Sequence, residues 1–103
     1  MTYAEFTENA EEGTARLHVH GHSGYAERGK DIVCAGVSVL VQTLALYLAE
    51  KGFDPEIVRG DGEMCVKAPY TGAAITAFEF CLTGLYALSD AFPDNIKILF
   101  QKS

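Results

Sequence analysis

Alternating apolar and polar residues predict that the chain begins with two paired strands. From Thr14 to Gly21, small or apolar residues at odd positions alternate with polar residues, including two histidines, at even positions. This period-two pattern is typical of a strand that packs one face against a core. The segment from Thr2 to Thr7 predicts a preceding strand, and the acid- and glycine-containing segment from Asn9 to Gly13 predicts the turn between them.

Two longer segments show the spacing of helices. The first is predicted from Ile32 to Lys51, with Asp31 as its N-cap and Gly52 just beyond its end. The second is predicted from Thr71 to about Ala91, with Thr71 as its cap. The apolar face of this second helix consists of Ile75, Phe78, Leu82, Leu85 and Leu88.

The remaining segments complete the predicted architecture. Strands are expected over Pro55 to Arg59, Glu63 to Lys67 and Asn95 to Gln101, and Gly60-Asp61-Gly62 predicts a hairpin between the first two. The resulting order ββαββαβ favours an α+β fold, a two-layer sandwich with both helices on one face of a mostly antiparallel sheet. A chain of 103 residues is long enough for one hydrophobic core, so we expect a single domain over residues 1–103.

The first predicted helix is apolar enough to be compared with a membrane span. Its charge-free run, from Ile32 to Ala49, lies at the lower limit of about 18 residues for such a span. However, Cys34, Ser38 and Gln42 are spaced four apart and form a polar stripe, and the amide of Gln42 would be costly in lipid. We therefore expect a core helix and no membrane partner.

Composition narrows the class of protein. The net charge of −6 argues against a nucleic-acid partner, which requires clustered lysine and arginine. Three cysteines form no closed disulfide framework in so short a chain. The first residues show neither the basic segment nor the apolar core of a secretory signal. These features predict a reduced, cytoplasmic domain.

The segment from Gly21 to Cys34 carries the strongest candidate chemistry. His22 stands at the end of a predicted strand, Cys34 stands in the first turn of the first predicted helix, and a polar, glycine-containing loop joins them. A helix N-terminus favours a thiolate, and a nearby imidazole can accept the thiol proton. The loop permits a Cys–His pair without proving one, since Cys34 also fits a small buried residue. Cys65 and Cys81 are expected to be structural.

Neighbouring polar residues admit both supporting and ordinary roles. Asp31 is either only a helix cap or also a residue that orients the histidine, as the third member of a hydrolytic triad does. Ser38, one turn beyond the cysteine, is either an ordinary helix serine or a hydroxyl that supports the site. Ser23 does not fit the serine nucleophile motif, because Tyr25 occupies its last glycine position.

The histidines allow a different function. His18, His20 and His22 have period-two spacing, so a continuing strand would place them on one face as zinc ligands. A solvated polar sheet face explains His18 and His20 equally well, and Gly21 makes a straight continuation to His22 doubtful.

Two stretches of this segment, Gly21 to Ala26 (GHSGYA) and Gly29 to Ser38 (GKDIVCAGVS), resemble the motif of the ribosomal-processing cysteine protease family, Prp. The order of elements and the length match along essentially the whole chain. The resemblance implies that His22 and Cys34 form the catalytic pair, accompanied by Asp31 and Ser38. The family usually has alanine where this chain has Ser23.

The resemblance also implies a function. Members are bacterial endopeptidases that trim a short N-terminal extension from the large-subunit ribosomal protein numbered twenty-seven, cutting after two aromatic residues and ahead of a small residue and a basic tail. They are typically homodimers, use no cofactor or metal, and move the loop between histidine and cysteine to admit substrate. We therefore expect a substrate loop that includes Ser23, Gly24, Tyr25 and Gly29, with Tyr25 as an apolar contact. A zinc-binding protein and a non-catalytic dimeric assembly module remain the alternatives.

The expected mechanism is acyl transfer. His22 abstracts the thiol proton, and Cys34 attacks the scissile carbonyl to form an acyl-enzyme. N–H groups at the helix start, with loop amides near Gly24 or Gly29, are the expected oxyanion donors. The loop from Ser23 to Lys30 is expected to act as a lid.

Overall fold

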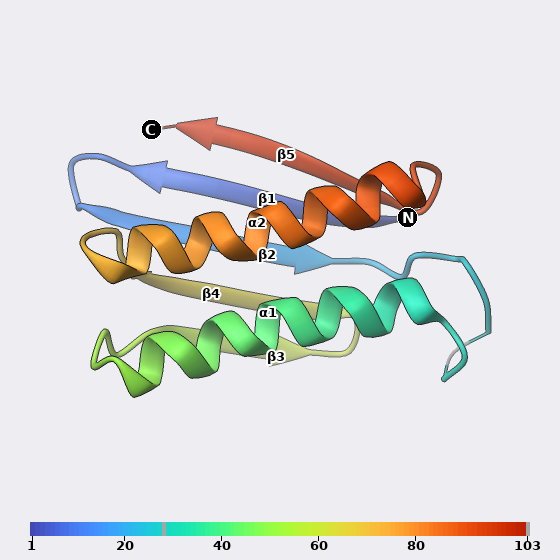
Figure 1. Cartoon of the computed structure of the whole chain (residues 1–103), viewed down its shortest axis with the longest axis horizontal. Helices are drawn as coiled ribbons and strands as arrows, with labels where there is room; N and C mark the ends of the chain where they lie inside the picture. The colour runs from blue at the N-terminus through green and yellow to red at the C-terminus, as the bar shows by residue number, and fades with distance from the viewer. Residues whose placement is uncertain (28, 103) are drawn as a thin grey trace.

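The structure, a computed structural model that describes residues 1–27 and 29–102, has the predicted order of elements (Figure 1). In this part of the chain the elements are β1 (Thr2–Asn9), β2 (Thr14–His20), α1 (Ile32–Glu50), β3 (Glu56–Gly60), β4 (Glu63–Pro69), α2 (Ala73–Ala91) and β5 (Ile96–Lys102). The strands form a mixed sheet in the order β3-β4-β2-β1-β5, in which only the β1–β5 pair is parallel among the described strands. Both helices cover the same face of this sheet (Figure 1), which confirms the α+β sandwich.

The start of α2 differs from the sequence prediction. The N-cap is Gly72 rather than Thr71, and no side-chain hydrogen bond caps the helix. Gly72 has φ 55° and ψ −131°, a conformation that glycine adopts more readily than other residues. The backbone carbonyl of Thr71, and not its hydroxyl, accepts a hydrogen bond, from the N–H of Ala74 at 3.1 Å. The prediction of a threonine cap was therefore wrong.

The start of α1 agrees with the prediction. One carboxylate oxygen of Asp31 accepts hydrogen bonds from the N–H groups of Val33 and Cys34, each at 3.0 Å. The helix ends at Glu50, with Lys51 as C-cap and Gly52 in the left-handed conformation at φ 81°. The capping residues read from the sequence thus define both ends of the helix that carries the candidate cysteine.

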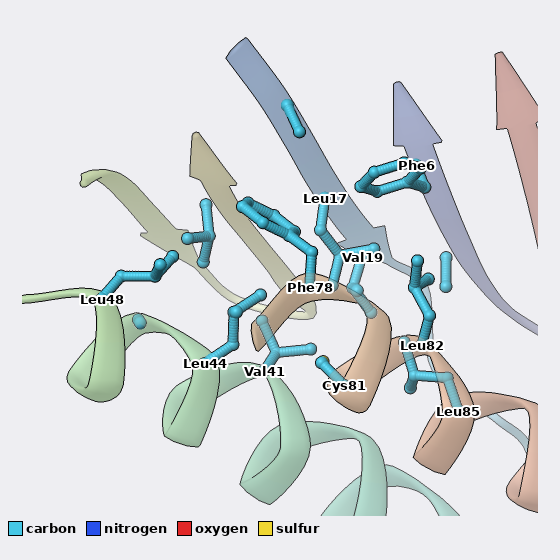
Figure 2. Close-up of a cluster of buried hydrophobic side chains, with 14 of the residues drawn as sticks. Phe6, Leu17, Val19, Val41, Leu44, Leu48, Phe78, Cys81, Leu82 and Leu85 are labelled. Atoms are coloured by element: carbon cyan, nitrogen blue, oxygen red, sulfur yellow. The ribbon is translucent and has the colours of Figure 1, made fainter. Parts of the chain in front are cut away.

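The core lies between the two helices and the sheet (Figure 2). Alternate residues of β2 point into this layer and are buried, as their period-two pattern predicted. Phe78 of α2 is completely buried and lies 5.7 Å from the ring of Phe6 on β1. Full burial of such a side chain contributes about 1.5–3 kcal/mol. α1 adds buried residues along its whole length: Val33, Val37, Val41, Leu44, Ala45 and Leu48.

By length and composition, α1 is also the one helix in the described chain that is apolar enough to cross a membrane. Packing accounts for part of this composition, since 33% of the apolar window is buried, whereas Val39 and Leu46 are exposed. The helix covers the sheet on one side and α2 on another, and a Cβ atom added to Gly84 of α2 would lie only 2.6 Å from Leu40 of α1. A Cβ atom on Gly36 would similarly lie 3.1 Å from Leu88. The two glycines therefore allow the close helix contact that makes α1 part of the core.

This arrangement brings three segments to one end of the sheet. The N-terminus of α1, the loop that follows β2, and the turn between β3 and β4 all lie at that end (Figure 1). The turn is held beside β2 because β4 pairs with β2, and the N–H of Gly21 donates to the carbonyl of Gly62 at 2.9 Å. The candidate site lies where these segments meet.

Candidate active site

A cavity of about 620 Å³ lies between the first turns of α1, the loop after β2 and the β3–β4 turn. His22 and Cys34 both line it. Ser38 and Gln42 follow Cys34 down the wall formed by α1, so the polar stripe predicted from their spacing faces this cavity. The remaining wall includes Arg59 of β3 and the turn residues Asp61 and Gly62.

Cys34 differs from the other two cysteines in its surroundings. All three carry free thiols. The sulfur of Cys34 accepts a hydrogen bond from the backbone N–H of Ser23 at 3.3 Å. Burial raises the pKa of Cys81 to about 12 and also raises the pKa of Cys65. The thiol of Cys81 donates instead to the carbonyl of Leu40, at 3.5 Å, inside the core. Of the three, Cys34 is the thiol that lines the cavity.

Asp31 joins the loop to the helix. Its first carboxylate oxygen caps α1, and its second accepts hydrogen bonds from the hydroxyl of Ser23 and the N–H groups of Tyr25 and Ala26. Burial alone would raise the pKa of Asp31, but the hydrogen bonds from Ser23, Cys34 and Ala26 outweigh it and lower this pKa to about 2. The side chain is therefore an ionised carboxylate at neutral pH.

The position of Asp31 changes two expectations. The N–H groups of Val33 and Cys34 donate to its side chain, and the N–H of Ala35 donates to its carbonyl at 3.1 Å. These helix-start groups, expected to bind an oxyanion, are already occupied by the cap. In addition, no hydrogen bond joins Asp31 to His22 among the residues described, so the structure gives no support for direct orientation of the imidazole by this carboxylate.

His22 lies over the β3–β4 turn. A Cβ atom added to Gly62 would lie 2.8 Å from Nε2 and 3.1 Å from Cε1 of the ring, so the imidazole rests on a position that only glycine leaves open. The carbonyl of His22 accepts a hydrogen bond from the amino group of Met1 at 2.7 Å. Within the described chain, no side-chain hydrogen bond links His22 to Cys34. The two residues share the cavity without a preformed thiol–imidazole bond.

The serines are held differently. Ser23 is 2% exposed; its hydroxyl donates to Asp31, and its carbonyl accepts from the side-chain amide of Asn95 at 3.0 Å. Ser38 is exposed to the cavity and accepts a hydrogen bond from the Gln42 amide at 2.6 Å. Ser23 therefore fixes the loop beside the sulfur, whereas Ser38 presents a hydroxyl one turn further along α1.

Tyr25, predicted as an apolar contact for the substrate, packs beside the cavity. Its ring packs edge-on against Phe92, with centroids 5.1 Å apart, and Tyr25 is not among the described residues that line the cavity. Gly24 and Gly29 do line the cavity and adopt positive φ angles of 74° and 89°. Arg28, which belongs to the predicted lid, lies outside the described residues.

The sequence did not predict that two residues, Gly62 and Asn95, belong to the site. Gly62 was interpreted only as part of a hairpin, and Asn95 only as the beginning of a strand. Their roles depend on contacts between distant segments: β4 lies beside β2, with Glu63 opposite His20, and the Asn95 amide donates to the carbonyl of Ser23, 72 positions away. No local spacing in the sequence indicates this neighbour relation.

The structure does not bring the three histidines together. Gly21, at φ 93°, ends the straight path of β2, so His22 enters the cavity on the helix side of the sheet. His18 and His20 lie on the opposite face, where their rings are 4.8 Å apart beside Glu5. The metal-capable group in the described chain contains Glu5, and not His22, as its third member.

The site has the parts of a cysteine hydrolase. They are a thiol at a helix N-terminus, a backbone N–H directed at its sulfur and an imidazole in the same cavity. Comparison of the sequence with models of protein families confirms that the protein is a cysteine hydrolase. The family model described as cysteine protease Prp matches residues 1–97, so the chain belongs to this family and is a cysteine protease.

Solved structures have the same fold. The essential ribosomal processing protease Prp from S. aureus, in complex with a covalently linked product peptide, has a TM-score of 0.87 and 24% identity, covering 97% of this chain and 99% of that chain. The same protease in complex with a substrate peptide has a TM-score of 0.82 and 23% identity, covering 97% of this chain and 99% of that chain. SMU.848 from Streptococcus mutans has a TM-score of 0.77 and 26% identity, covering 100% of this chain and 96% of that chain. Comparison with curated protein sequences gives no match.

Proposed function

We propose that this protease is an endopeptidase that removes a short N-terminal extension from a large-subunit ribosomal protein precursor. The family shows a cysteine protease, and the S. aureus relative is a ribosomal processing protease that holds a substrate peptide. The observation that carries the proposal is the position of the Cys34 thiol, at the N-terminus of α1 and in one cavity with His22.

The reaction proceeds through an acyl-enzyme. His22 accepts the thiol proton of Cys34, and the sulfur attacks the scissile carbonyl. The tetrahedral intermediate collapses, the C–N bond breaks, and His22 returns the proton to the leaving amine. Water, deprotonated by His22, then hydrolyses the thioester and releases the extension with a free carboxylate.

The loop supplies the oxyanion donor in this proposal. Since Asp31 occupies the N–H groups at the start of α1, the nearest candidate is the N–H of Ser23, which lies 3.3 Å from the Cys34 sulfur. An oxyanion formed on the attacked carbon lies next to that sulfur, within reach of the same N–H group. Gly24, the next residue, lines the cavity and offers a second donor.

Asp31 and Ser38 have supporting roles. Asp31 positions the oxyanion donor, because its bonds to Ser23, Tyr25 and Ala26 hold the loop against the first turn of α1. Ser38 accepts from Gln42 and thus keeps its own O–H proton for another acceptor, which we propose is a carbonyl of the bound peptide.

The proposed partners follow from the site and the family. The substrate is a peptide segment with two aromatic residues before the cut and a basic tail after it, and the net charge of −6 favours such a tail. We propose that the loop around Gly24 and Gly29 moves to admit this peptide, since both glycines lie at the cavity with backbone conformations in which glycine has the greatest freedom. The enzyme is proposed to act as a homodimer in the cytoplasm, without nucleic acid or membrane.

The test is cleavage of a synthetic peptide that spans the extension junction, followed by mass spectrometry. The wild type should cut once, after the aromatic pair. Cys34→Ala should abolish cleavage, whereas the matched variant Cys65→Ala should retain it. A dimer that leaves the junction peptide intact would favour the assembly module instead.

A further inference from the structure

The face of the sheet that the helices leave open carries a second cluster of reactive side chains. Glu5 on β1 lies directly opposite His18 on β2, and His20 follows two residues later on the same face. The candidate metal-binding atoms of these three residues all lie within 4.8 Å of one another. The protease cavity lies on the other side of the sheet, so its mechanism does not use this cluster.

The distances in the cluster are close to those of a metal site. Oε2 of Glu5 lies 2.5 Å from Nε2 of His20 and 4.0 Å from Nδ1 of His18. With zinc–ligand bonds of about 2.0–2.1 Å, ligand atoms in a tetrahedral site lie about 3.3 Å apart. The first distance must therefore open, and the second close, by less than about 1 Å. The two imidazole nitrogens, which lie within 4.8 Å of each other, must approach by up to about 1.5 Å through side-chain rotation.

Neighbouring groups hold the two imidazoles in suitable orientations. Nε2 of His18 lies 3.4 Å from a carboxylate oxygen of Glu63, which favours a proton on Nε2 and leaves the lone pair on Nδ1, the atom that faces Glu5. The ring of His20 stacks on Tyr3, with centroids 5.5 Å apart. A carboxylate behind a ligating histidine is the usual outer partner in zinc sites.

We propose that Glu5, His18 and His20 form a divalent metal site that takes Zn²⁺. Two imidazoles and a carboxylate suit zinc better than magnesium or calcium, which prefer oxygen ligands. The three side chains are 25–36% exposed, so water completes the coordination and the ion can exchange with solvent. Bound zinc would link β1 to β2 and stabilise the sheet on the side opposite the protease cavity.

Zinc binding is tested with the full chain in a Cys34→Ala background, which removes the cavity thiol as a competing ligand. Calorimetric titration with zinc alone should show one ion per chain and a rise in melting temperature. His18→Gln combined with His20→Gln should abolish this binding, and Glu63→Gln should weaken it about 10-fold. The matched variant His22→Gln should bind zinc as before.

Three results would overturn the proposal: no zinc bound by the parent protein, equal binding by the double glutamine variant, or binding lost only with His22→Gln. The Co²⁺ absorption spectrum provides a second measurement, because a tetrahedral site with nitrogen ligands has a visible band that depends on the ligands. That band should appear in the parent protein and disappear in the folded double variant, as judged by circular dichroism. Its persistence in that variant would place the ion elsewhere.

Discussion

Substitution of Gly62 by alanine tests whether the β3–β4 turn positions His22 for catalysis. The added Cβ atom would lie 2.8 Å from Nε2 of the imidazole, whereas non-bonded contacts lie at about 3.5–4.0 Å. The ring must therefore move by about 1 Å. Because a misplacement of about 1 Å in a catalytic group can cost roughly 100-fold in rate, we expect kcat/KM of Gly62→Ala to fall by up to about 100-fold.

The same substitution also strains the backbone, since Gly62 has φ 64°. The left-handed conformation costs a non-glycine residue about 1–2 kcal/mol, so the melting temperature should fall by roughly 4–16 °C. Gly13→Ala is the matched control, because Gly13 has φ 68° and its added Cβ would meet no described atom within 4 Å.

Both variants should lose similar stability, but only Gly62→Ala should lose activity. Thermal unfolding and cleavage of the junction peptide, measured on the two variants below their melting temperatures, separate these effects. Equal kcat/KM values for Gly62→Ala and Gly13→Ala would refute the view that the position of His22 over this turn matters for cleavage.

Three further predictions concern Asp31, the cysteines and the core. Asp31→Asn keeps an oxygen for the cap but loses the charge, and should lower stability at pH 7 by about 1–2 kcal/mol. The pKa of Asp31 in the folded protein, about 2, lies below the ordinary value of 3.8. The extra stability of the wild type over Asp31→Asn should therefore be complete above about pH 4 and disappear as the pH falls through about 2. Urea unfolding that shows a constant stability difference between the two proteins down to about pH 2 would contradict this. Iodoacetamide at neutral pH should modify Cys34 and spare Cys81, whose pKa is about 12, and mass spectrometry that finds Cys81 modified first would argue against the assigned environments. Phe78→Ala should cost about 3–5 kcal/mol in urea unfolding, and a loss below about 1 kcal/mol would mean that this ring is not central to the core.

Local patterns predicted much of the fold. The period-two alternation identified β2, and its buried side chains are the ones expected to face the core. Asp31 was expected to cap α1 and does so with two hydrogen bonds. The spacing of Cys34, Ser38 and Gln42 predicted one polar face, which lines the cavity. Each of these features depends on residues within a few positions of one another, so it can be predicted from short segments of the sequence.

Contacts between distant segments were not predictable in this way. Gly62 lies beneath His22 because β4 pairs with β2, and Asn95 reaches Ser23 across 72 positions of the chain. The grouping of Glu5 with His18 likewise requires the register of β1 against β2. Thr71 was assigned as a cap from its residue type, but the backbone of Gly72 begins the helix without a side-chain bond. Pairing, register and backbone conformation are set by the whole fold.

The central claim is that the Cys34 sulfur becomes acylated by the peptide segment before the cut. The most direct measurement is rapid acid quenching of the enzyme with the junction peptide in single-turnover experiments, followed by digestion and mass spectrometry. We predict a transient thioester on Cys34 that carries the N-terminal extension and decays as the free extension appears. Cleavage with no adduct on Cys34, or with the adduct on another residue, would contradict the account.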